Sequence, residues 1–589
     1  MDHAVSRFDR AVRGVAGLGL LIAVAICLHA VHRFGQERFF TIDEYQFGHA
    51  TWLVSEGHRP YADFYEHHFP LSYVLHAPVL FGDGSFRERV LRLRTLPFAY
   101  LALLCAVLGV AGYAVTRNPY AALLSALSPL AVGFSLMSAV DYRADNFAAC
   151  LFLACLALLE ANRRWDRRGV ALWCGLLFMV ACFMTQKLAV VGGGTLVILG
   201  ACDSVRRRRA RGAAAPFIRR PAAFAASAAA VFVAVVGTGA LLGLLPAAWE
   251  ATLLDAIRHE RLYPTTSPLA RYWGPFWSAT ALSTLPIAAF ALVFVAGGRG
   301  GFWRVPILVS ALAAALARAQ YPYNYVLLAD LVALCAARGF AQVVEALPRR
   351  PAFARALRPL LYLLPLAVLP DQYAFLARAS SNKPQLDLLR KIETFSSEDD
   401  AVIDNAGGAL FRNHGSYYFH HGRAHQRMFA DYFARGLIAD YRRSQALFWI
   451  ADFRLGDLPR NVRRFWSRHY IPVDRDLYTL GFATPRTSDA PVELEIDVIR
   501  AGDYHIHAAR TVAPDAPPPA GGGARGRLQI ESREIRGGTV HLEARRYRIT
   551  VLPGSAPMFL SLLPPEAFEP WVSGTGHHTR LFEFRDPAP

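Results

Sequence analysis

Charged residues are scarce in this 589-residue chain: they make up 19% of it, whereas 54% of its residues are hydrophobic. A soluble enzyme needs more charged residues on its surface, so this composition excludes a soluble enzyme. Apolar blocks of bilayer-spanning length, about 17 to 25 residues, recur between residues 15 and 369. The last third of the chain has an ordinary soluble composition, so the sequence predicts two domains.

Cysteine pairs are also missing. The eight cysteines lie within the hydrophobic blocks without a CxxC pair, which excludes a disulfide framework and a cysteine metal site. Lysine is nearly absent, with three lysines among 63 basic residues. The net charge of +17 comes from arginines clustered between apolar blocks. That distribution argues against a nucleic-acid partner.

The apolar blocks predict a polytopic α-helical membrane domain with about eleven transmembrane helices. The block at 15–31 resembles a signal peptide, but no cleavage site follows it, so we interpret it as a retained first span. The expected spans are 14–34, 93–115, 119–139, 146–162, 169–185, 188–203, 222–245, 275–297, 302–319, 323–345 and 357–370.

Arginine clusters orient these spans. With a cytoplasmic N-terminus, the clusters at 163–168, 206–211 and 349–358 all fall on the cytoplasmic side, as the positive-inside rule requires. We expect a multi-pass protein of the cytoplasmic (inner) membrane whose C-terminal domain is periplasmic or extracellular. Four arginines at 87–94 fall on the outer side, where they either anchor lipid headgroups or bind a phosphate.

We expect a transmembrane domain at 1–370, with a first outer loop at 35–92, and a soluble mixed α/β domain at 371–589. Ala401 to Ile403 has the composition of a short buried strand, and 428–453 has helical spacing. Alternating polar and apolar residues at 492–496 and 504–507 predict strands. The part from about 490 to 589 is therefore expected to be a small β-sandwich.

The first outer loop carries an acidic pair, Asp43 and Glu44, shortly after the first span, with aromatic residues such as Tyr65 around it. Ionisable groups at the membrane boundary are either functional or snorkelling into solvent. A second polar group, "DYRADN", contains Asp141, Arg143 and Asp145 and interrupts an apolar stretch. Its charges either form an internal ion pair or serve a function.

Two further outer-side segments are polar. Lys187, in "MTQKLAVV", is suited to a phosphate oxygen, although a snorkelling lysine at a helix end is also common. Tyr323 and Asn324 lie in "YPYNYVLL" at the outer end of the tenth span. All these groups face one side of the membrane.

The motif "DEYQ" after the first span, followed by "YADFYEHHFPLSYVLHAP" and an arginine-bearing entry to the second span, resembles the GT-C membrane glycosyltransferases of the protein O-mannosyltransferase and lipid A aminoarabinose transferase type. "DYRADN" and "YPYNYVLL" are similar to that family's second acidic motif and late outer-side motif. The resemblance covers residues 10 to 350. Relatives with a lysine and two prolines in the first loop differ from this chain, which has His67, His68, Phe69 and one proline there.

The resemblance implies a GT-C-like fold and inverting transfer of a sugar from a polyprenyl-phosphate donor to a hydroxyl of a lipid, glycan or protein at the outer membrane face. Asp43 would be the catalytic carboxylate, with Glu44 beside it and Asp145 as the second acidic residue. Candidate ligands of the donor phosphate are Lys187, Arg92, Arg94 and His68, and candidate sugar contacts are Tyr65, Glu66, Tyr323 and Asn324.

Asp43 and Asp145 are also candidate ligands of a divalent metal, with magnesium or manganese favoured by their oxygen atoms. Two other functions compete with transfer. A secondary transporter or lipid flippase would carry its functional charges near mid-span. A membrane-anchored glycan sensor would leave the acidic groups inert.

Overall fold

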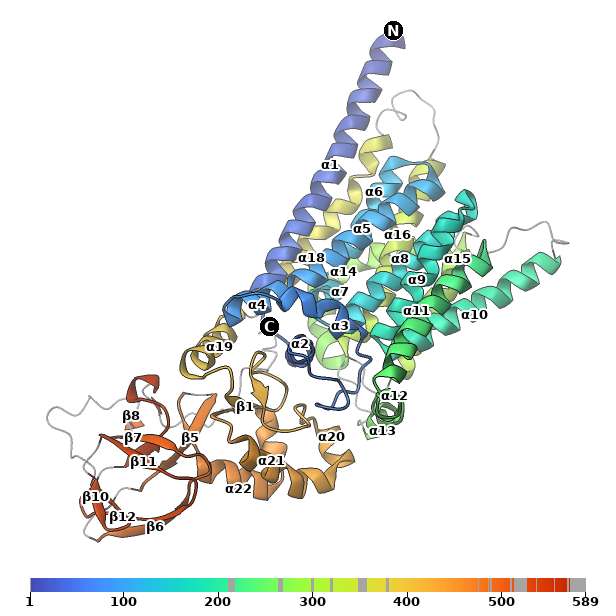
Figure 1. Cartoon of the computed structure of the whole chain (residues 1–589). Coiled ribbons are helices and arrows are strands. Elements are labelled where there is room, and N and C mark those ends of the chain that lie inside the picture. The colour runs from blue at the N-terminus through green and yellow to red at the C-terminus, as the bar shows by residue number, and fades with distance from the viewer. Residues whose placement is uncertain are drawn as a thin grey trace.

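Figure 1 shows the computed structural model of the chain. It describes residues 2–209, 218–262, 269–297, 301–317, 321–347, 358–377, 381–474, 476–485, 487, 490–508, 511–512, 527–535, 538–555, 557–568 and 571–572. Arg211 and residues 349–357 of the expected arginine clusters lie outside these ranges.

The described residues form a helical membrane domain with seven helices long and apolar enough to cross a membrane: Arg10–Glu37, Phe86–Thr116, Ala144–Trp165, Gln186–Arg209, Pro221–Leu241, Tyr323–Ala346 and Arg358–Leu376. Pro119–Leu130 and Gly133–Ala139 add an eighth if this pair, bent by 62°, is one span. The other three expected spans contain the shorter apolar helices Arg168–Met184, Thr280–Ala296 and Gly301–Leu316. Because these three helices are too short to be counted as spans, the described residues give seven to eight spans and not eleven.

Figure 1 shows the helices of the membrane domain lying side by side. The described α-helices before the C-terminal part, together with the 3-10 helix η4, are α1 (Asp2–Glu37), α2 (Ile42–Ser55), α3 (Leu71–His76), α4 (Phe86–Leu93), α5 (Thr95–Thr116), α6 (Pro119–Leu127), α7 (Gly133–Ala139), α8 (Ala144–Trp165), α9 (Arg168–Met184), α10 (Gln186–Arg209), α11 (Pro221–Leu241), α12 (Leu245–Trp249), α13 (Asp255–Leu262), α14 (Leu269–Ala296), α15 (Gly301–Leu316), η4 (Pro322–Tyr325), α16 (Val326–Ala346) and α18 (Leu369–Leu376).

The buried share of a span distinguishes a central helix of the bundle from one that faces lipid. In α8, 89% of the most apolar window is buried, whereas in α11 only 6% is. An apolar surface that no other helix covers is stable only in a lipid environment. The pattern therefore indicates that α8 is the core of the bundle and that α11 faces acyl chains.

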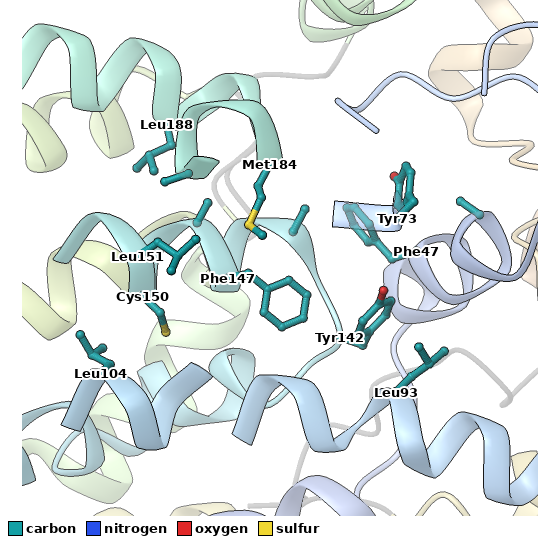
Figure 2. Packing of buried hydrophobic residues seen from close by; sticks show 14 of the residues in the cluster. Phe47, Tyr73, Leu93, Leu104, Tyr142, Phe147, Cys150, Leu151, Met184 and Leu188 are labelled. Carbon is teal, nitrogen blue, oxygen red and sulfur yellow. The ribbon is translucent and has the colours of Figure 1, made fainter. Parts of the chain in front are cut away.

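The hydrophobic core continues from the bundle into the first loop (Figure 2). Phe47 of α2 and Tyr73 of α3 have ring centres 5.8 Å apart, and Tyr142 packs against Phe147 of α8 at 5.5 Å. All four belong to one buried cluster with the span helices. The loop helices are thus anchored on the bundle.

The C-terminal part begins with α19 (Lys383–Phe395) and contains an eight-stranded sheet of order β11-β7-β13-β5-β3-β1-β2, with β4 paired to β5. β1 (Ala401–Ile403) is parallel to both β2 (Asn413–His414) and β3 (Phe448–Ile450). The other strands of this sheet are β4 (Tyr470–Pro472), β5 (Leu477–Ala483), β7 (Gly502–Ala508), β11 (Gly538–Leu542) and β13 (Met558–Ser561).

A second sheet of order β10-β9-β12-β6 shares one hydrophobic core with β5, β7, β11 and β13, which makes this region the expected sandwich. Its strands are β6 (Val492–Asp497), β9 (Leu528–Ile530), β10 (Arg533–Ile535) and β12 (Arg546–Val551), and β8 (Thr511–Val512) pairs with β14 (Trp571–Val572). The strands predicted at 401–403, 492–496 and 504–507 are confirmed.

The helix expected at 428–453 is only partly correct. Helical structure there consists of the end of α20 (Arg423–Met428), η6 (Tyr432–Gly436) and α21 (Leu437–Ser444), and β3 then follows. The run from Phe448 to Ile450 is a short apolar segment, whose pattern does not distinguish a buried strand from a helix. The remaining helical elements of this part are η7 (Phe453–Asp457) and α22 (Arg460–His469).

Candidate active site

Asp43 lies in the first turn of α2, whose start is fixed by a capping box. Thr41 Oγ1 accepts a hydrogen bond from the Glu44 amide at 3.4 Å, and Glu44 Oε2 accepts one from the Thr41 amide at 2.9 Å. This arrangement satisfies two amides that the helix itself leaves unpaired. The Asp43 side chain is 27% exposed. Its carboxylate is therefore sheltered by the protein and still reachable from outside.

Arg143 joins the two acidic motifs. Its guanidinium forms an ion pair with Asp43, and its Nη2 lies 3.3 Å from Asp145 Oδ2. Its central carbon also lies 3.7 Å from the centre of the Tyr323 ring. Burial opposes ionisation of Asp43, but the charge and hydrogen bond of Arg143 hold the pKa of this carboxyl below its usual range. Asp43 is consequently ionised at neutral pH.

The break between α9 and α10 brings Lys187 to the same cluster. Thr185 occupies the break, and its hydroxyl donates to Asp145 Oδ1 at 2.8 Å. Lys187 Nζ lies 3.2 Å from Asp145 Oδ2 and 3.4 Å from Asn324 Oδ1. Its side chain is 53% exposed, in contrast to the 4% of Arg143. Lys187 is thus a cation of the cluster that an external anion can reach.

Glu44 and Arg94 form a separate, buried ion pair. Arg94 Nη2 donates to Glu44 Oε2 at 2.7 Å and Arg94 Nε donates to Glu44 Oε1 at 3.0 Å. The amide of Tyr142 donates to the same Oε1 at 3.1 Å. Arg94 also donates to three backbone carbonyls, those of Gly35, Arg38 and Phe39. Both residues are thus engaged inside the protein, and the structure brings neither to the Asp43 cluster.

Arg92 is also directed elsewhere. Its guanidinium donates to the carbonyls of Phe81, at 3.3 Å, and Asp83, at 3.0 Å, within the first loop. Of the four residues expected at the donor phosphate, only Lys187 lies in direct contact with an acidic residue of the Asp43 cluster.

Glu66 organises the first loop from within. Its side chain is completely buried, and its Oε1 accepts hydrogen bonds from the amides of His67 and His68 at 2.9 and 3.1 Å. The same oxygen lies 2.6 Å from His68 Nδ1, and Gln46 Nε2 donates to it at 3.2 Å. The Tyr65 hydroxyl donates to Asp255 Oδ2 of α13 at 3.2 Å. Glu66 and Tyr65 therefore hold the loop in shape and join it to α13.

Four histidines from separate parts of the chain converge beside Glu66. His67 has ring-centre distances of 5.0 Å to His425, 5.5 Å to His259 and 6.3 Å to His420. His259 and His425 lie 4.6 Å apart. Burial lowers the pKa of His259 to about 4 and lowers those of the other three well below the usual value. These imidazoles are neutral at pH 7 and can act as metal ligands.

The C-terminal part contributes a cation as well. Arg454 follows β3, Asn405 follows β1, and Arg454 Nη1 donates to the Asn405 carbonyl at 2.8 Å. The carboxyl ends of parallel strands meet at one edge of a sheet, where ligand sites commonly form. The charge of buried Arg454 contributes to the low pKa of Asp43. Sequence reasoning missed Arg454, His420 and His425, because no local pattern connects them with the first loop.

The two candidate metal sites differ in how well their side chains suit a metal ion. Asp43 and Asp145 share the Arg143 guanidinium, so a divalent cation between them would have to displace a buried arginine. They do not fit the expected magnesium or manganese site. Ligand atoms of Glu66, His67 and His68 lie within 4.8 Å of one another. One carboxylate and two imidazoles suit zinc or a similar transition metal better than magnesium.

No protein-family model matches the sequence, and no curated protein matches it. Among solved structures, ArnT from Cupriavidus metallidurans bound to undecaprenyl phosphate matches with a TM-score of 0.52 and 12% identity, covering 78% of this chain and 97% of that one. ArnT in the apo state matches with a TM-score of 0.49 and 15% identity, covering 68% and 84%. The oligosaccharyltransferase AglB from Archaeoglobus fulgidus, in complex with an inhibitory peptide and a dolichol-phosphate, gives 0.46 and 13%, covering 74% and 70%.

The match to undecaprenyl-phosphate-bound ArnT covers nearly the whole of that protein. An identity of 12% restricts the likeness to the fold. The resemblance drawn from the sequence motifs is confirmed at the level of the fold. The chain has the fold of the GT-C membrane glycosyltransferases.

Proposed function

We propose that this protein is an inverting glycosyltransferase that moves a sugar from a polyprenyl-phosphate donor to an acceptor hydroxyl. The observation that carries the proposal is the continuous network of Asp43, Arg143, Asp145 and Lys187, assembled from three separate segments of a chain with this fold. The ArnT neighbour binds undecaprenyl phosphate, and we assign this chain a carrier of the same class.

In the proposed reaction, the acceptor hydroxyl oxygen attacks the anomeric carbon from the face opposite the lipid phosphate. As the new C–O bond forms, the hydroxyl proton passes to Asp43. The bond between the anomeric carbon and the phosphate oxygen breaks, and its electron pair leaves with the lipid phosphate. This order of bonds inverts the anomeric centre without a covalent enzyme intermediate.

The leaving phosphate gains negative charge, and we assign its stabilisation to Lys187. Its Nζ is anchored by Asp145 at 3.2 Å, and its side chain is half-exposed. A cation held in place in advance of the reaction stabilises developing charge without reorganising. Arg454 contributes to the positive charge around Asp43, and we assign His68 to the donor end of the site.

Other residues take supporting roles in this proposal. Glu44 and Arg94 fix the start of α2 and are not assigned to substrate, because their polar atoms are used inside the protein. Glu66 orients His68 through the 2.6 Å contact with its Nδ1. Tyr323 supports Arg143 through its ring, and Asn324 supports Lys187.

We further propose eleven membrane crossings with a cytoplasmic N-terminus, a domain boundary near residue 370 and the C-terminal domain outside the cytoplasm. The arginine clusters at 163–168, 206–211 and 349–358, which all fall on the cytoplasmic side, support this orientation. Membrane-impermeant maleimide labelling of single cysteines tests it: a cysteine at Arg435 is labelled in intact spheroplasts and one at Arg164 is not. The opposite result would reverse the topology.

A transition metal bound by Glu66, His67 and His68 is the cofactor that these side chains suit best. When bound, it would supply positive charge beside the first loop. The chain's own residues would hold that loop in shape, and no step of the proposed reaction requires the metal.

The decisive experiment supplies purified protein with radiolabelled polyprenyl-phosphate sugars and with lipid, glycan and peptide acceptors. We expect transfer by the wild type and near-complete loss in Asp43→Asn. Because donor hydrolysis is recorded in the same assay, an enzyme that cleaves the donor without the correct acceptor is still detected. Absence of both transfer and donor hydrolysis across carriers would overturn the proposal.

A further inference from the structure

Tyr142 lies in the short connection between α7 and α8, directly before Arg143. Residues 140–143 form a turn and extended backbone, not a helix, and Arg143 has φ −142° and ψ 137°. The position of Arg143 therefore depends on the side chains that hold this connection. Asp141 holds it from one side, through a buried ion pair with Arg38 at 2.5 Å. Tyr142, which is 3% exposed, holds it from another.

The Tyr142 side chain is surrounded by apolar and aromatic groups. Figure 2 shows it among the side chains of the buried cluster. Its ring centre lies 5.5 Å from that of Phe147 and 5.6 Å from that of His76. A phenylalanine would fill the same space, whereas a buried hydroxyl requires a hydrogen-bond partner. The partners of this hydroxyl therefore show what it contributes.

A chain of hydrogen bonds extends from the Tyr142 hydroxyl in two directions. On one side, Tyr142 Oη lies 2.8 Å from Thr51 Oγ1, whose single proton is donated to the Phe47 carbonyl at 2.8 Å. Tyr142 is therefore the donor to Thr51. On the other side, His76 Nδ1 lies 3.1 Å from Tyr142 Oη, and His76 Nε2 lies 3.2 Å from the Tyr100 hydroxyl.

The proton positions of this chain follow from its two ends. Burial lowers the pKa of His76 to about 4, so the ring carries one N–H at pH 7. Because the Tyr142 proton is donated to Thr51, the histidine N–H is at Nδ1 and points to Tyr142. Its Nε2 then accepts from Tyr100. Each contact has one proton, and a fully satisfied buried network holds its side chains in one arrangement.

Tyr142 also contacts α2 through its backbone, because its amide donates to Glu44 Oε1 at 3.1 Å. Glu44 and Thr51 are separated by about two helical turns, so they lie on the same face of α2. Tyr142 thus binds α2 at two levels, and α2 carries Asp43 in its first turn. Both partners of the ion pair between Asp43 and Arg143 are consequently attached to this one tyrosine.

We propose that Tyr142 is a positioning residue of the transferase, which sets the Asp43 carboxylate and the Arg143 guanidinium relative to each other through its two contacts with α2. The inference rests on the proposed function, because it takes Asp43 as the base. Tyr142 requires no contact with substrate for this role. Loss of its hydroxyl oxygen alone should therefore slow catalysis and leave the fold in place.

The test measures single-turnover transfer by the purified full-length protein in phosphatidylcholine nanodiscs, with the radiolabelled undecaprenyl-phosphate sugar and the acceptor that the wild type uses. Tyr142→Phe should lower the transfer rate at saturating donor by at least about tenfold, because a displacement of about 1 Å in a reacting group can cost 10²-fold. Its affinity for undecaprenyl phosphate should stay close to that of the wild type. A weakened affinity with an unchanged rate at saturating donor would overturn the proposal.

Tyr470→Phe is the matched control. The Tyr470 hydroxyl is also buried, and it donates to the Ala446 carbonyl at 2.9 Å within the C-terminal part. Its loss should lower the unfolding temperature about as much as the loss of the Tyr142 hydroxyl does, with transfer at the wild-type rate. Equal losses of rate in the two variants would reduce Tyr142 to a purely structural residue.

The pH dependence of transfer separates positioning from stability. When Asp43 and Arg143 are held less firmly together, the effect of burial on the Asp43 pKa is less compensated. The acid limb of the pH–rate profile should therefore move to higher pH in Tyr142→Phe and stay in place in Tyr470→Phe. The charges of His68 and Arg454, which also act on Asp43, are unchanged in both variants. Identical limbs in the two variants would contradict the proposal.

Thr51 provides a second test, which remains valid if Tyr142→Phe does not fold. Thr51→Val removes the hydroxyl at the other end of the same hydrogen bond and should slow transfer in the same way. Thr51→Ser, which keeps the hydroxyl, should recover most of that rate. Because both changes break one bond, the double variant of Tyr142→Phe and Thr51→Val should be no slower than the slower single variant. Losses that multiply would show that the two residues act separately and would overturn the proposal.

Turnover by the wild type distinguishes a failure of this inference from a failure of the proposed function. If the wild type neither transfers the sugar nor hydrolyses the donor, the proposed function is wrong. If the wild type is active and Tyr142→Phe matches Tyr470→Phe in rate and pH profile, only the role of Tyr142 is wrong.

Discussion

Replacing Asp43 with asparagine tests the proposed chemistry most directly. The change keeps the shape of the side chain and removes the charge that accepts the proton. General-base catalysis contributes about 10²–10⁴ to a rate, equivalent to about 3–5 kcal/mol of barrier. We therefore expect the transfer rate to fall by at least about 10², with the apparent affinity for the donor changed much less.

The same substitution has a calculable effect on stability. It leaves buried Arg143 with Asp145 and the Tyr323 ring as partners. Removing one partner of a buried charge pair costs about 3–5 kcal/mol when the remaining charge is left alone. Because Arg143 keeps a second carboxylate, we expect a smaller loss, about 1–3 kcal/mol. Thermal unfolding of the purified variant should show a lowered but cooperative transition.

The assay follows radiolabelled sugar from carrier to acceptor under single-turnover conditions. Asp63→Asn is the control, because Asp63 is also in the first loop but pairs with Arg59 at the surface, with a shortest contact of 2.7 Å from the Arg59 amide to Asp63 Oδ2. It should transfer at the wild-type rate. Turnover of Asp43→Asn within threefold of the wild type would refute the assignment of Asp43 as the base.

The pH profile gives a second readout of the same group. A carboxylate whose pKa is lowered in the folded protein stays ionised as pH falls. The acid limb of the pH–rate profile for sugar transfer should therefore lie below about pH 3.9, the ordinary pKa of aspartate. In Arg143→Gln the opposing effect of burial is no longer compensated, so the limb should shift to higher pH. A limb that stays in place would contradict the role of Arg143.

Four further outcomes are expected. Glu44→Gln should destabilise the protein by about 3–5 kcal/mol, because it leaves buried Arg94 without its carboxylate. Thermal unfolding should show a smaller loss of stability for the double variant Glu44→Gln with Arg94→Met than for Glu44→Gln alone. Lys187→Met should lower the transfer rate by about 10²–10³, and Lys187→Arg should recover part of it in the same assay. Mass-spectrometric metal analysis of purified protein should find a transition metal, with less of it in His67→Ala. Gln385→Ala should lower transfer and unfolding temperature together, because its amide bonds both backbone polar groups of Phe40, at 2.7 and 2.9 Å.

The sequence was sufficient to predict a helical membrane domain followed by a mixed α/β part with a sandwich, because each depends on local pattern, although about eleven spans were expected and the described residues give seven to eight. It was less informative about Asp43 and Glu44 as a pair. Adjacent side chains on a helix diverge by about 100°, so only Asp43 faces Arg143, and Glu44 turns toward Arg94. An acidic pair that is adjacent in sequence is therefore not a pair in space.

The part of the site contributed by the C-terminal region could not have been predicted. His420, His425 and Arg454 are separated from His67 by more than 350 residues and follow short strands and turns without periodicity. Their approach depends on how β1 and β3 are oriented against the first loop. Only long-range packing determines that orientation, and composition carries no signal for it.

The C-terminal region also controls where α2 lies. A 14-residue helix is marginal by itself, and a displacement of about 1 Å in a reacting group can cost 10²-fold in rate. α2 is held against the bundle by Phe47. On its other side, His49 Nδ1 lies 2.9 Å from the Leu410 carbonyl, and the Tyr65 amide donates to the Tyr417 carbonyl at 3.0 Å. Because Asp43 is placed by contacts from both sides, the catalytic unit that we propose comprises both the membrane helices and the C-terminal region, even where the latter touches no substrate.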